Sequence, residues 1–158
     1  MSDYRIGIDP GLTGAVALLA GKRALRVWDM PVVTEGRGKG VCAVLLAATL
    51  TEARELSSER PEVILERVGA RPGQGVTSMF SFGRAAGIAE GVVAALGLPL
   101  RRVTPESWKR RARLTGKPKD AARALAIDLF PEIASELARK RDGGRADALL
   151  LAYYGSEH

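Results

Sequence analysis

Residues 4–15 have the sequence Tyr-Arg-Ile-Gly-Ile-Asp-Pro-Gly-Leu-Thr-Gly-Ala, and this stretch decides the fold. We expect residues 4–9 to form a buried strand, because Ile6 and Ile8 alternate along it and Pro10-Gly11 ends the run. The apolar residues that follow predict a second strand over residues 13–20. The chain therefore turns back sharply on itself directly after Asp9.

Asp9 is the first candidate functional residue, because a carboxylate at the end of a core strand needs a partner. Burying an unpaired charge costs several kcal/mol, so Asp9 requires a metal ion, a cationic neighbour or access to water. The alternative is that Asp9 only accepts hydrogen bonds from turn amides near Gly11 and Thr13. The stretch alone leaves these two interpretations open.

Beyond this turn the sequence predicts one further strand and then alternating helices and strands. Residues 31–40 are rich in glycine and charge and predict a mobile loop. A mixed sheet with helices packed on it is typical of such an order, and the length suits one domain over residues 1–158. The expected strands are 4–9, 13–20, 24–30, 62–66 and 98–103, and the expected helices are 41–58, 79–96, a short one from 104, 118–130 and 145–155.

Two of the expected helices have patterned faces. The helix at 41–58 has apolar residues at helical spacing, which are Val41, Val44, Leu45 and Ala48. The helix at 79–96 has an apolar seam that contains Met79, Phe82, Ala86, Ala89, Val93 and Leu96. A glycine stripe at 83, 87 and 91 predicts close backbone approach, either to this domain's own sheet or to another subunit.

Composition narrows the possible classes of function. The chain has 158 residues with one cysteine, Cys42, and one histidine, His158. A disulfide within the chain, a histidine-ligated zinc site and a Ser-His triad are therefore excluded. No signal peptide or membrane span is expected, which predicts a cytoplasmic protein. The net charge of +6 indicates a polyanionic partner, most simply nucleic acid, although a basic surface without a partner also has this charge.

Carboxylates recur where the expected elements end or turn inward. Asp9 and Glu66 end two strands, Asp147 shares the apolar face of the last helix, and Asp142 precedes that helix beside two glycines. Clustered carboxylates repel one another unless a cation joins them, and oxygen ligands suit Mg²⁺ or Mn²⁺. Two such ions support phosphodiester cleavage. The alternative is that Glu66 pairs with an arginine, Asp142 caps the helix and Asp147 forms an internal salt bridge.

These motifs together resemble the RuvC family of Holliday-junction resolvases, particularly the compact RuvC-like proteins of bacteriophages. The resemblance is spread over nearly the whole chain. The matching stretches are Ile6-Gly7-Ile8-Asp9-Pro10-Gly11, Val63-Ile64-Leu65-Glu66, the Pro72-Gly73-Gln74-Gly75 loop through Phe82-Gly83, Thr104-Pro105-Glu106-Ser107-Trp108-Lys109, and Asp142-Gly143-Gly144-Arg145-Ala146-Asp147-Ala148-Leu149.

The resemblance implies an α/β ribonuclease H-like fold, with a mixed five-stranded sheet of three antiparallel strands and then parallel strands. It further implies a homodimer that nicks two strands of a four-way DNA junction symmetrically during recombination and repair. Mg²⁺ or Mn²⁺, two ions per active site, would serve as cofactor, without an organic cofactor or a membrane. If the protein is phage-encoded, the host cytoplasm is its expected location.

The resemblance also assigns the acids. Asp9, Glu66 and Asp147 match metal-binding acids of the family. Bacterial RuvC proteins have an Asp-x-x-Asp pair at the last helix, where this chain has Gly144, and Asp142 is the expected substitute. Because a ligand beside two glycines is held loosely, we expect Mn²⁺ to be preferred over Mg²⁺.

The resemblance places DNA contacts on basic and aromatic residues around these acids. The family uses an aromatic residue after the second acid to unstack bases, for which Phe80 or Phe82 is the candidate. The expected DNA-binding residues are Arg67, Arg71, Gln74, Phe80, Lys109, Arg110, Arg111, Arg113, Lys117 and Lys119.

Two other classes of function remain compatible with the sequence. One is an actin-like phosphotransferase or ATPase, whose phosphate loop also follows an aspartate; the short chain and its positive charge disfavour this class. The other is a protein that binds four-way junctions without cleaving them.

Overall fold

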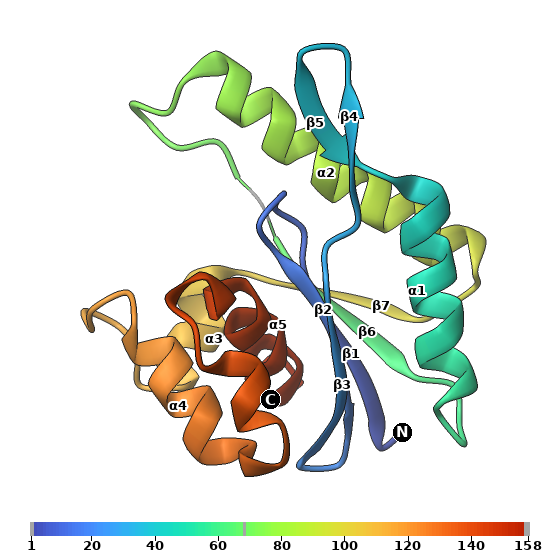
Figure 1. The fold of residues 1–158 in the computed structure, drawn as a ribbon, viewed down its shortest axis with the longest axis vertical. Coiled ribbons are helices and arrows are strands. Elements are labelled where there is room, and N and C mark those ends of the chain that lie inside the picture. The colour runs from blue at the N-terminus through green and yellow to red at the C-terminus, as the bar shows by residue number, and fades with distance from the viewer. Residues whose placement is uncertain (1, 68, 157–158) are drawn as a thin grey trace.

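The computed structural model describes residues 2–67 and 69–156, and its centre is a mixed sheet of five strands in the order β3-β2-β1-β6-β7 (Figure 1). Three successive antiparallel strands form one half of it; β6 then pairs parallel with β1, and β7 pairs parallel with β6 at the edge. The predicted strand arrangement is therefore confirmed. The strands are β1 (Tyr4–Asp9), β2 (Ala15–Ala20), β3 (Arg23–Asp29), β6 (Glu62–Glu66) and β7 (Leu100–Val103).

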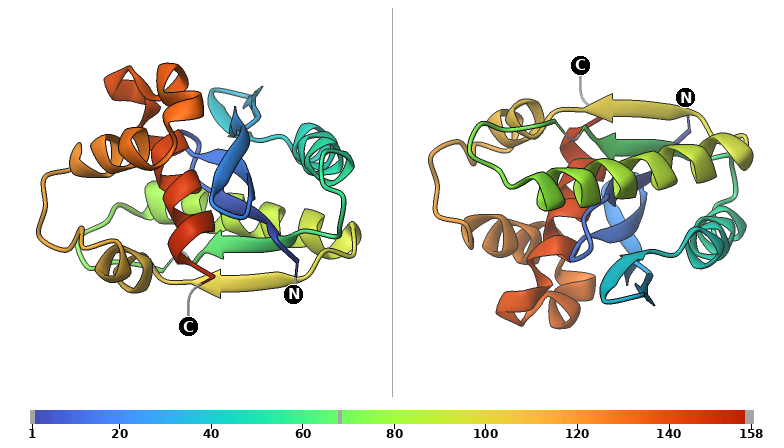
Figure 2. Two further views of the ribbon diagram at one scale, coloured as in Figure 1. Left: turned by 90° about the horizontal axis from the view of Figure 1, so that it is seen from below. Right: turned by 90° about the horizontal axis from the view of Figure 1, so that it is seen from above.

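Helices cover both faces of this sheet (Figure 2). One face packs against α1 (Ala43–Glu55) and α2 (Val76–Ala95), and the other packs against α5 (Gly143–Tyr154). Beside α5 lie α3 (Pro105–Arg111), α4 (Ala121–Leu129) and the 3-10 segments η1 (Pro131–Leu137) and η2 (Lys140–Asp142). Within the described ranges, no helix is both long and apolar enough to cross a membrane.

The alternation of side chains along β1 explains why α5 lies so close to the sheet. Ile6 and Ile8 point into the core beneath α1 and α2, whereas Gly7 faces α5. A Cβ at Gly7 would collide with the carbonyl oxygen of Ala148 and lie 2.9 Å from the backbone nitrogen of Ala152. The missing side chain thus lets α5 pack directly on the central strand, which brings the start of that helix to the end of β1 that carries Asp9.

Residues 31–40 form a hairpin, so the predicted loop is wrong. Strand β4 (Val32–Glu35) pairs antiparallel with β5 (Gly38–Val41), and Gly36 in the turn has φ +58°. Glycine adopts this conformation without steric cost, as a tight hairpin requires. An ion pair between Glu35 and Arg84 ties the hairpin to α2.

The inward face of α1 also differs from the prediction. Leu46, Leu50 and Ala53 are buried, while Val44 is 78% exposed. The cause is the helix start: Val41 belongs to β5 and the helix begins only at Ala43, so a pattern counted from Val41 selects the wrong face.

On α2, the predicted inward residues Ala89 and Val93 are buried, together with Ala85. The glycine stripe of this helix does not pack on the domain's own sheet. A Cβ at Gly83, Gly87 or Gly91 would meet no described atom within 4 Å. The stripe therefore faces open space, which leaves contact with another subunit as the prediction that remains.

Candidate active site

The register of two parallel strands brings the first two acids together. Ile8 of β1 lies beside Leu65 of β6, and each strand ends one residue later, on Asp9 and Glu66. Both acids alternate with residues that face α1 and α2, so both point to the face that α5 covers. Because carboxyl ends of parallel neighbours meet at the same edge of a sheet, this pair follows directly from the topology.

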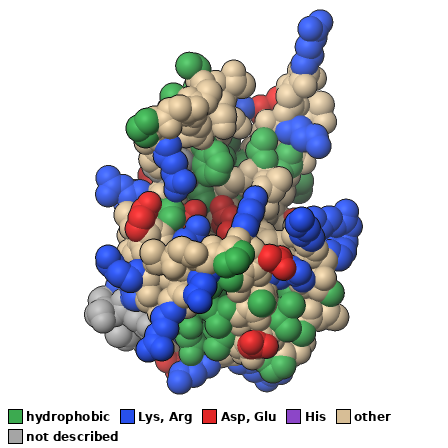
Figure 3. All heavy atoms as spheres, turned by 90° about the vertical axis from the view of Figure 1, so that its left-hand side faces the viewer, with side chains coloured by type: hydrophobic (Ala, Val, Ile, Leu, Met, Phe, Trp, Pro, Cys, Tyr) green, Lys and Arg blue, Asp and Glu red, His purple; other side chains and the backbone are tan. Residues whose placement is uncertain are grey.

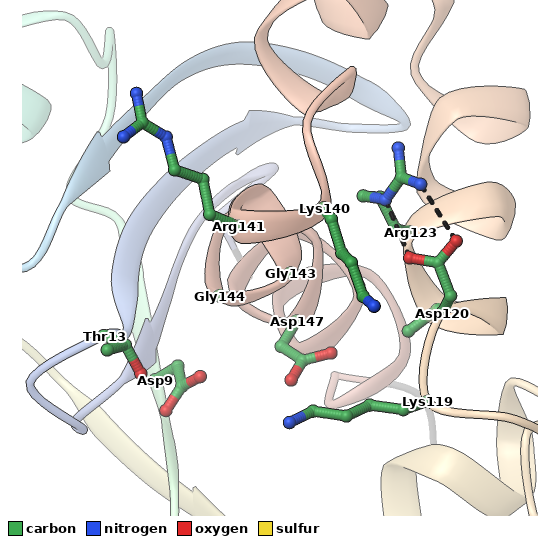
Figure 4. Close-up of a pocket in the computed structure, with 11 residues that line it drawn as sticks. Asp9, Thr13, Lys119, Asp120, Arg123, Lys140, Arg141, Gly143, Gly144 and Asp147 are labelled. Atoms are coloured by element: carbon green, nitrogen blue, oxygen red, sulfur yellow. Dashed lines mark hydrogen bonds and ion pairs between the residues drawn. The ribbon is translucent and has the colours of Figure 1, made fainter.

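Asp147 joins these acids from the first turns of α5. Figure 4 shows its carboxylate directed toward the same space as that of Asp9, with Lys119 extending below Asp147 from the segment before α4. Leu150 and Leu151, which share its helix face, are buried as predicted. The structure therefore brings together Asp9, Glu66 and Asp147 from three elements.

Burial and mutual repulsion make these carboxylates reluctant to ionise. Burial, and then the charge of Asp147, raise the pKa of Asp9 to about 6. Burial, followed by Glu66, likewise raises the pKa of Asp147 to about 6, and burial followed by Asp9 raises that of Glu66. Lys109 opposes the rise in pKa at all three acids. Such a set of opposed charges is typical of a functional site.

The hydrogen-bond and ion-pair partners of each acid show whether the acid can have a purely structural role. The backbone N–H of Gly11 donates to Asp9 Oδ1 at 3.4 Å, so the predicted turn contact exists but is long. Glu66 accepts a hydrogen bond from Trp108 and forms no ion pair within the described ranges. Asp147 likewise has no salt bridge among described residues. The alternative of separately paired, purely structural acids is therefore unsupported for Glu66 and Asp147.

Trp108 is a partner of the site that the sequence did not indicate. Its ring is fully buried beneath α5, and its Nε1–H donates to Glu66 Oε2 at 2.8 Å. Thr104 starts α3 by accepting a hydrogen bond from the Ser107 amide, which fixes the helix that carries Trp108. The indole thus holds one oxygen of Glu66 and leaves Oε1 for a ligand.

We expect Trp108→Phe to weaken divalent-cation binding by about 10- to 100-fold, the usual effect of losing a partner that orients a metal ligand. Calorimetric titration of the DNA-free protein with Mn²⁺ measures this. Phe130→Leu is the matched control, since Phe130 is equally buried in the same core cluster. Equal metal affinity in Trp108→Phe and the control would show that the indole serves packing alone.

Asp142 does not join the other acids, so the prediction that it replaces the missing ligand is wrong in this structure. It is 2% exposed, and its carboxylate accepts hydrogen bonds from the backbone and side chain of Arg139. This contact holds the pKa of Asp142 below its usual range. Nor does its side chain cap α5; instead it accepts hydrogen bonds from the residue that precedes η2.

The last helix also begins earlier than predicted, at Gly143 rather than at residue 145. A Cβ at Gly144 would collide with the carbonyl oxygen of Thr13 and lie 3.1 Å from its carbonyl carbon. No side chain fits there without moving the turn that follows Asp9. The packing of α5 on this turn therefore explains why the position has no acid.

The donor set fits a divalent cation in its chemistry. Oxygen ligands suit hard cations, and a bound cation removes the repulsion that raises these pKa values. Among residues 2–67 and 69–156, no three Asp, Glu, His or Cys side chains converge closely enough to hold one ion as they stand. Binding an ion therefore requires the acids to draw closer together.

Basic side chains surround the acids. In Figure 3, acidic side chains lie recessed near the centre of this face, with Lys and Arg side chains around them. One cavity of about 410 Å³ contains Asp147 and the predicted residues Arg71, Lys109, Lys117 and Lys119. A smaller cavity of about 200 Å³ contains Glu66, Arg67, Arg71, Gln74 and Phe82.

The other four predicted DNA-binding residues lie differently. Arg110 and Arg113 are exposed but line none of the cavities described here, and the Arg111 guanidinium donates to Ser107 on its own helix. Phe80 is 72% exposed on α2, whereas Phe82 borders the cavity beside Glu66. Phe82 is thus nearer the acids than Phe80.

A third cavity, of about 780 Å³, is lined by two cations that are not among the predicted DNA-binding residues. Lys140 and Arg141 line it together with Asp9 and Asp147. The sequence does contain an indication of these cations, because Arg139-Lys140-Arg141 is a run of basic residues directly before Asp142.

Comparison with known proteins gives the fold and a relative. No family model matches the chain. Over 151 residues it is 36% identical to Holliday junction resolvase MOC1, chloroplastic, of Chlamydomonas reinhardtii, an alignment that covers 80% of this chain and 17% of that protein. The structure matches T. thermophilus RuvC in complex with Holliday junction substrate with a TM-score of 0.66 at 18% identity. It matches a second Thermus thermophilus RuvC structure with a TM-score of 0.53 at 19% identity, and each match covers 94% of this chain and 90% of the other.

The sheet order and these matches define the ribonuclease H-like fold of RuvC, as predicted. The chain is a homologue of part of a Holliday junction resolvase, and it spans 17% of the length of that relative. The predicted resemblance to the resolvases is thereby confirmed, and its bacteriophage type stays a prediction.

Proposed function

We propose that the protein is a structure-selective endodeoxyribonuclease that resolves four-way DNA junctions by nicking two strands symmetrically. The observation that carries this proposal is the meeting of Asp9, Glu66 and Asp147 at one end of a RuvC-type sheet, with Lys109 and Lys119 beside them. The homology to a resolvase supports the same substrate. The positive charge of the chain supports a DNA partner.

A divalent cation, Mg²⁺ or Mn²⁺, would be held by Asp9, Asp147 and the free oxygen of Glu66. When bound, two such ions supply an activated water and stabilise the leaving oxygen of the phosphodiester. The expected preference for Mn²⁺ depended on a loosely held Asp142, and the hydrogen bonds of Asp142 to Arg139 remove that reason.

Lys109 and Lys119 offset the negative charge of the carboxylates before DNA binds and that of a DNA phosphate afterwards. Both cations lower the pKa of Asp147, so they favour the ionised carboxylate that a metal requires. Lys109 is further held by its position over the Trp108 ring, 5.5 Å from the ring centroid. A phosphate entering the site would exchange its counterions for these ammonium groups.

Cleavage of labelled substrates tests the proposal. Four-way junction, linear duplex and flap are each incubated with Mg²⁺, Mn²⁺ or EDTA, and the nicked strands are mapped. We expect paired nicks in two junction strands of like polarity, with either metal and without cleavage in EDTA. Tight junction binding with no nicking in either metal would instead identify a binding protein, and saturable ATP binding would identify a phosphotransferase or ATPase.

We further propose a homodimer, because a four-way junction needs two active sites on matching strands. The α2 glycine stripe faces open space beside the exposed side chains of Val76 and Phe80, which are 79% and 72% exposed. An unpartnered, largely apolar helix face of this kind suits a self-complementary contact.

Gly87→Leu should convert the dimer to a monomer without unfolding the chain. The added side chain meets no described atom of its own chain, and leucine favours a helix over glycine by up to about 1 kcal/mol. Light scattering measures the mass, and thermal unfolding checks the fold. Ala48→Leu on the exposed side of α1 is the control. A wild-type monomer at concentrations that support cleavage would contradict the dimer.

A further inference from the structure

The segment expected to supply a fourth acid supplies two cations instead. Asp142 turns inward to Arg139, and the residues before it, Lys140 and Arg141, are exposed at the rim of the 780 Å³ cavity. Figure 4 shows Lys140 extending into the cavity above Asp147, whereas Arg141 points away from the acids toward the outer rim. Between them these residues present charge along the edge of the cavity rather than at one point.

The local structure fixes where these two side chains lie. The Arg139 backbone N–H donates to Asp142 Oδ2 at 2.9 Å, and the Arg139 guanidinium donates to Oδ1 at 2.8 Å. These hydrogen bonds join the residue before the 3-10 turn of η2 to the last residue of that turn. The turn in turn leads directly into α5, which packs on β1. The two cations are therefore carried by an ordered element and not by a free loop.

No described carboxylate forms an ion pair with either of these two cations. In the two ranges that the structure describes, neither Lys140 nor Arg141 has an ion-pair partner within 4 Å. Arg123, and to a lesser extent Lys140, lower the pKa of Asp120 on the opposite wall, but the Asp120 carboxylate is already bound by Nε and Nη2 of Arg123, each at 2.9 Å. Lys119 adds a further cation on that wall. The cavity thus has free positive charge at its rim and the candidate catalytic acids at its base.

The shape of the surface indicates a strand rather than a small anion. This cavity and the 410 Å³ cavity share Lys119, Ala122 and Asp147, so the two meet at the acid. Cations therefore line one path on both sides of Asp147, with Lys109 and Lys117 on one side and Lys140 and Arg141 on the other. A chain of phosphates that passes Asp147 would contact both groups.

We propose that Lys140 and Arg141 bind backbone phosphates of the strand being cut, next to the scissile phosphate and on the side away from Lys117. This inference rests on the proposed function, and it adds the path of the strand through the site. The contacts are made to phosphates, so they contribute affinity and register without sequence preference.

The salt dependence of junction binding tests this path. Binding of the wild type and of Lys140→Gln/Arg141→Gln is measured in EDTA over a range of salt concentrations. Each lost phosphate contact lowers the log–log slope by about 0.9. Between about 50 and 200 mM salt, the affinity of the wild type should therefore fall by a factor about ten times larger than that of the variant. Both residues are exposed, so the fold should be retained, which thermal unfolding confirms.

Lys22→Gln/Arg23→Gln removes the same charge as a matched control. These exposed cations lie at the β2–β3 turn, at the opposite end of the sheet from Asp9. We expect this control to keep the wild-type slope. Equal slopes in both double variants and the wild type would overturn the strand path while leaving junction cleavage intact. Failure of the wild type to bind junctions at all would instead overturn the proposed function.

Discussion

Asp9→Asn should lower the rate of junction nicking by about a thousandfold or more while leaving junction affinity in EDTA nearly unchanged. A ligand carboxylate shared by the metal ions contributes several kcal/mol to the transition state, and each ~1.4 kcal/mol is a factor of ten in rate. Affinity comes mainly from Lys and Arg contacts to phosphates, which the substitution keeps. Single-turnover cleavage and binding isotherms measure the two quantities.

The same substitution should stabilise the metal-free fold. The pKa values of Asp9 and Asp147 are about 6 in the folded chain against an ordinary 3.8. Between about pH 4 and 6 the folded state therefore binds more protons than the unfolded chain, and stability falls as the pH rises through that window. Well above pH 6 both carboxylates are ionised in the folded state, and the full destabilisation from their burial is present. Since asparagine cannot ionise, Asp9→Asn should raise the free energy of unfolding at pH 8 in EDTA by on the order of 1–3 kcal/mol.

Asp3→Asn separates this effect from a general change of charge. Asp3 is exposed just before β1, at the end of the strand away from the site. We expect that variant to cleave and unfold like the wild type. If Asp9→Asn nicked junctions at the wild-type rate, Asp9 would not be a catalytic residue. If the variant were less stable than the wild type in EDTA, the role of Asp9 would be structural.

The parts of this molecule that the sequence predicted are those fixed by local pattern and by sheet geometry. Alternation along residues 4–20 gives two antiparallel strands, and the carboxyl ends of parallel strands necessarily bring Asp9 and Glu66 together. Asp147 follows because the apolar side of its helix has one inward direction. No knowledge of distant contacts is needed for these three residues.

The parts that the sequence could not give depend on packing between distant segments or on one helix boundary. Trp108 and Glu66 are 42 residues apart, and their hydrogen bond exists only because α3 lies against the end of β6. The predicted inward face of α1 is wrong because the prediction starts the helix at residue 41, two residues before its true start at Ala43. Asp142 was misassigned because its contact with Arg139 competes with the metal site, and charge alone does not show which of them the carboxylate will meet.

Gly144→Asp, which would restore the Asp-x-x-Asp pair of bacterial RuvC proteins, should destabilise the fold and lower cleavage. A Cβ there collides with the carbonyl oxygen of Thr13 and lies 3.2 Å from the Gly14 Cα. Backbone cannot move aside as the end of a side chain can, so we expect a loss of about 3 kcal/mol or more, at the upper end of overpacked cores. The displaced turn would also carry Asp9 away from Glu66. Chemical denaturation and single-turnover cleavage measure both effects.

Gly143→Ala provides the matched control one residue earlier in the same helix. A Cβ at Gly143 meets no described atom within 4 Å, and alanine reduces the entropy of the unfolded chain relative to glycine, by about 0.4–1 kcal/mol. This variant should therefore be as stable as the wild type or more so, with unchanged cleavage. If Gly144→Asp were equally stable and more active, α5 could not lie as close to the turn after Asp9 as it does here, and the absence of an acid at position 144 would need another cause.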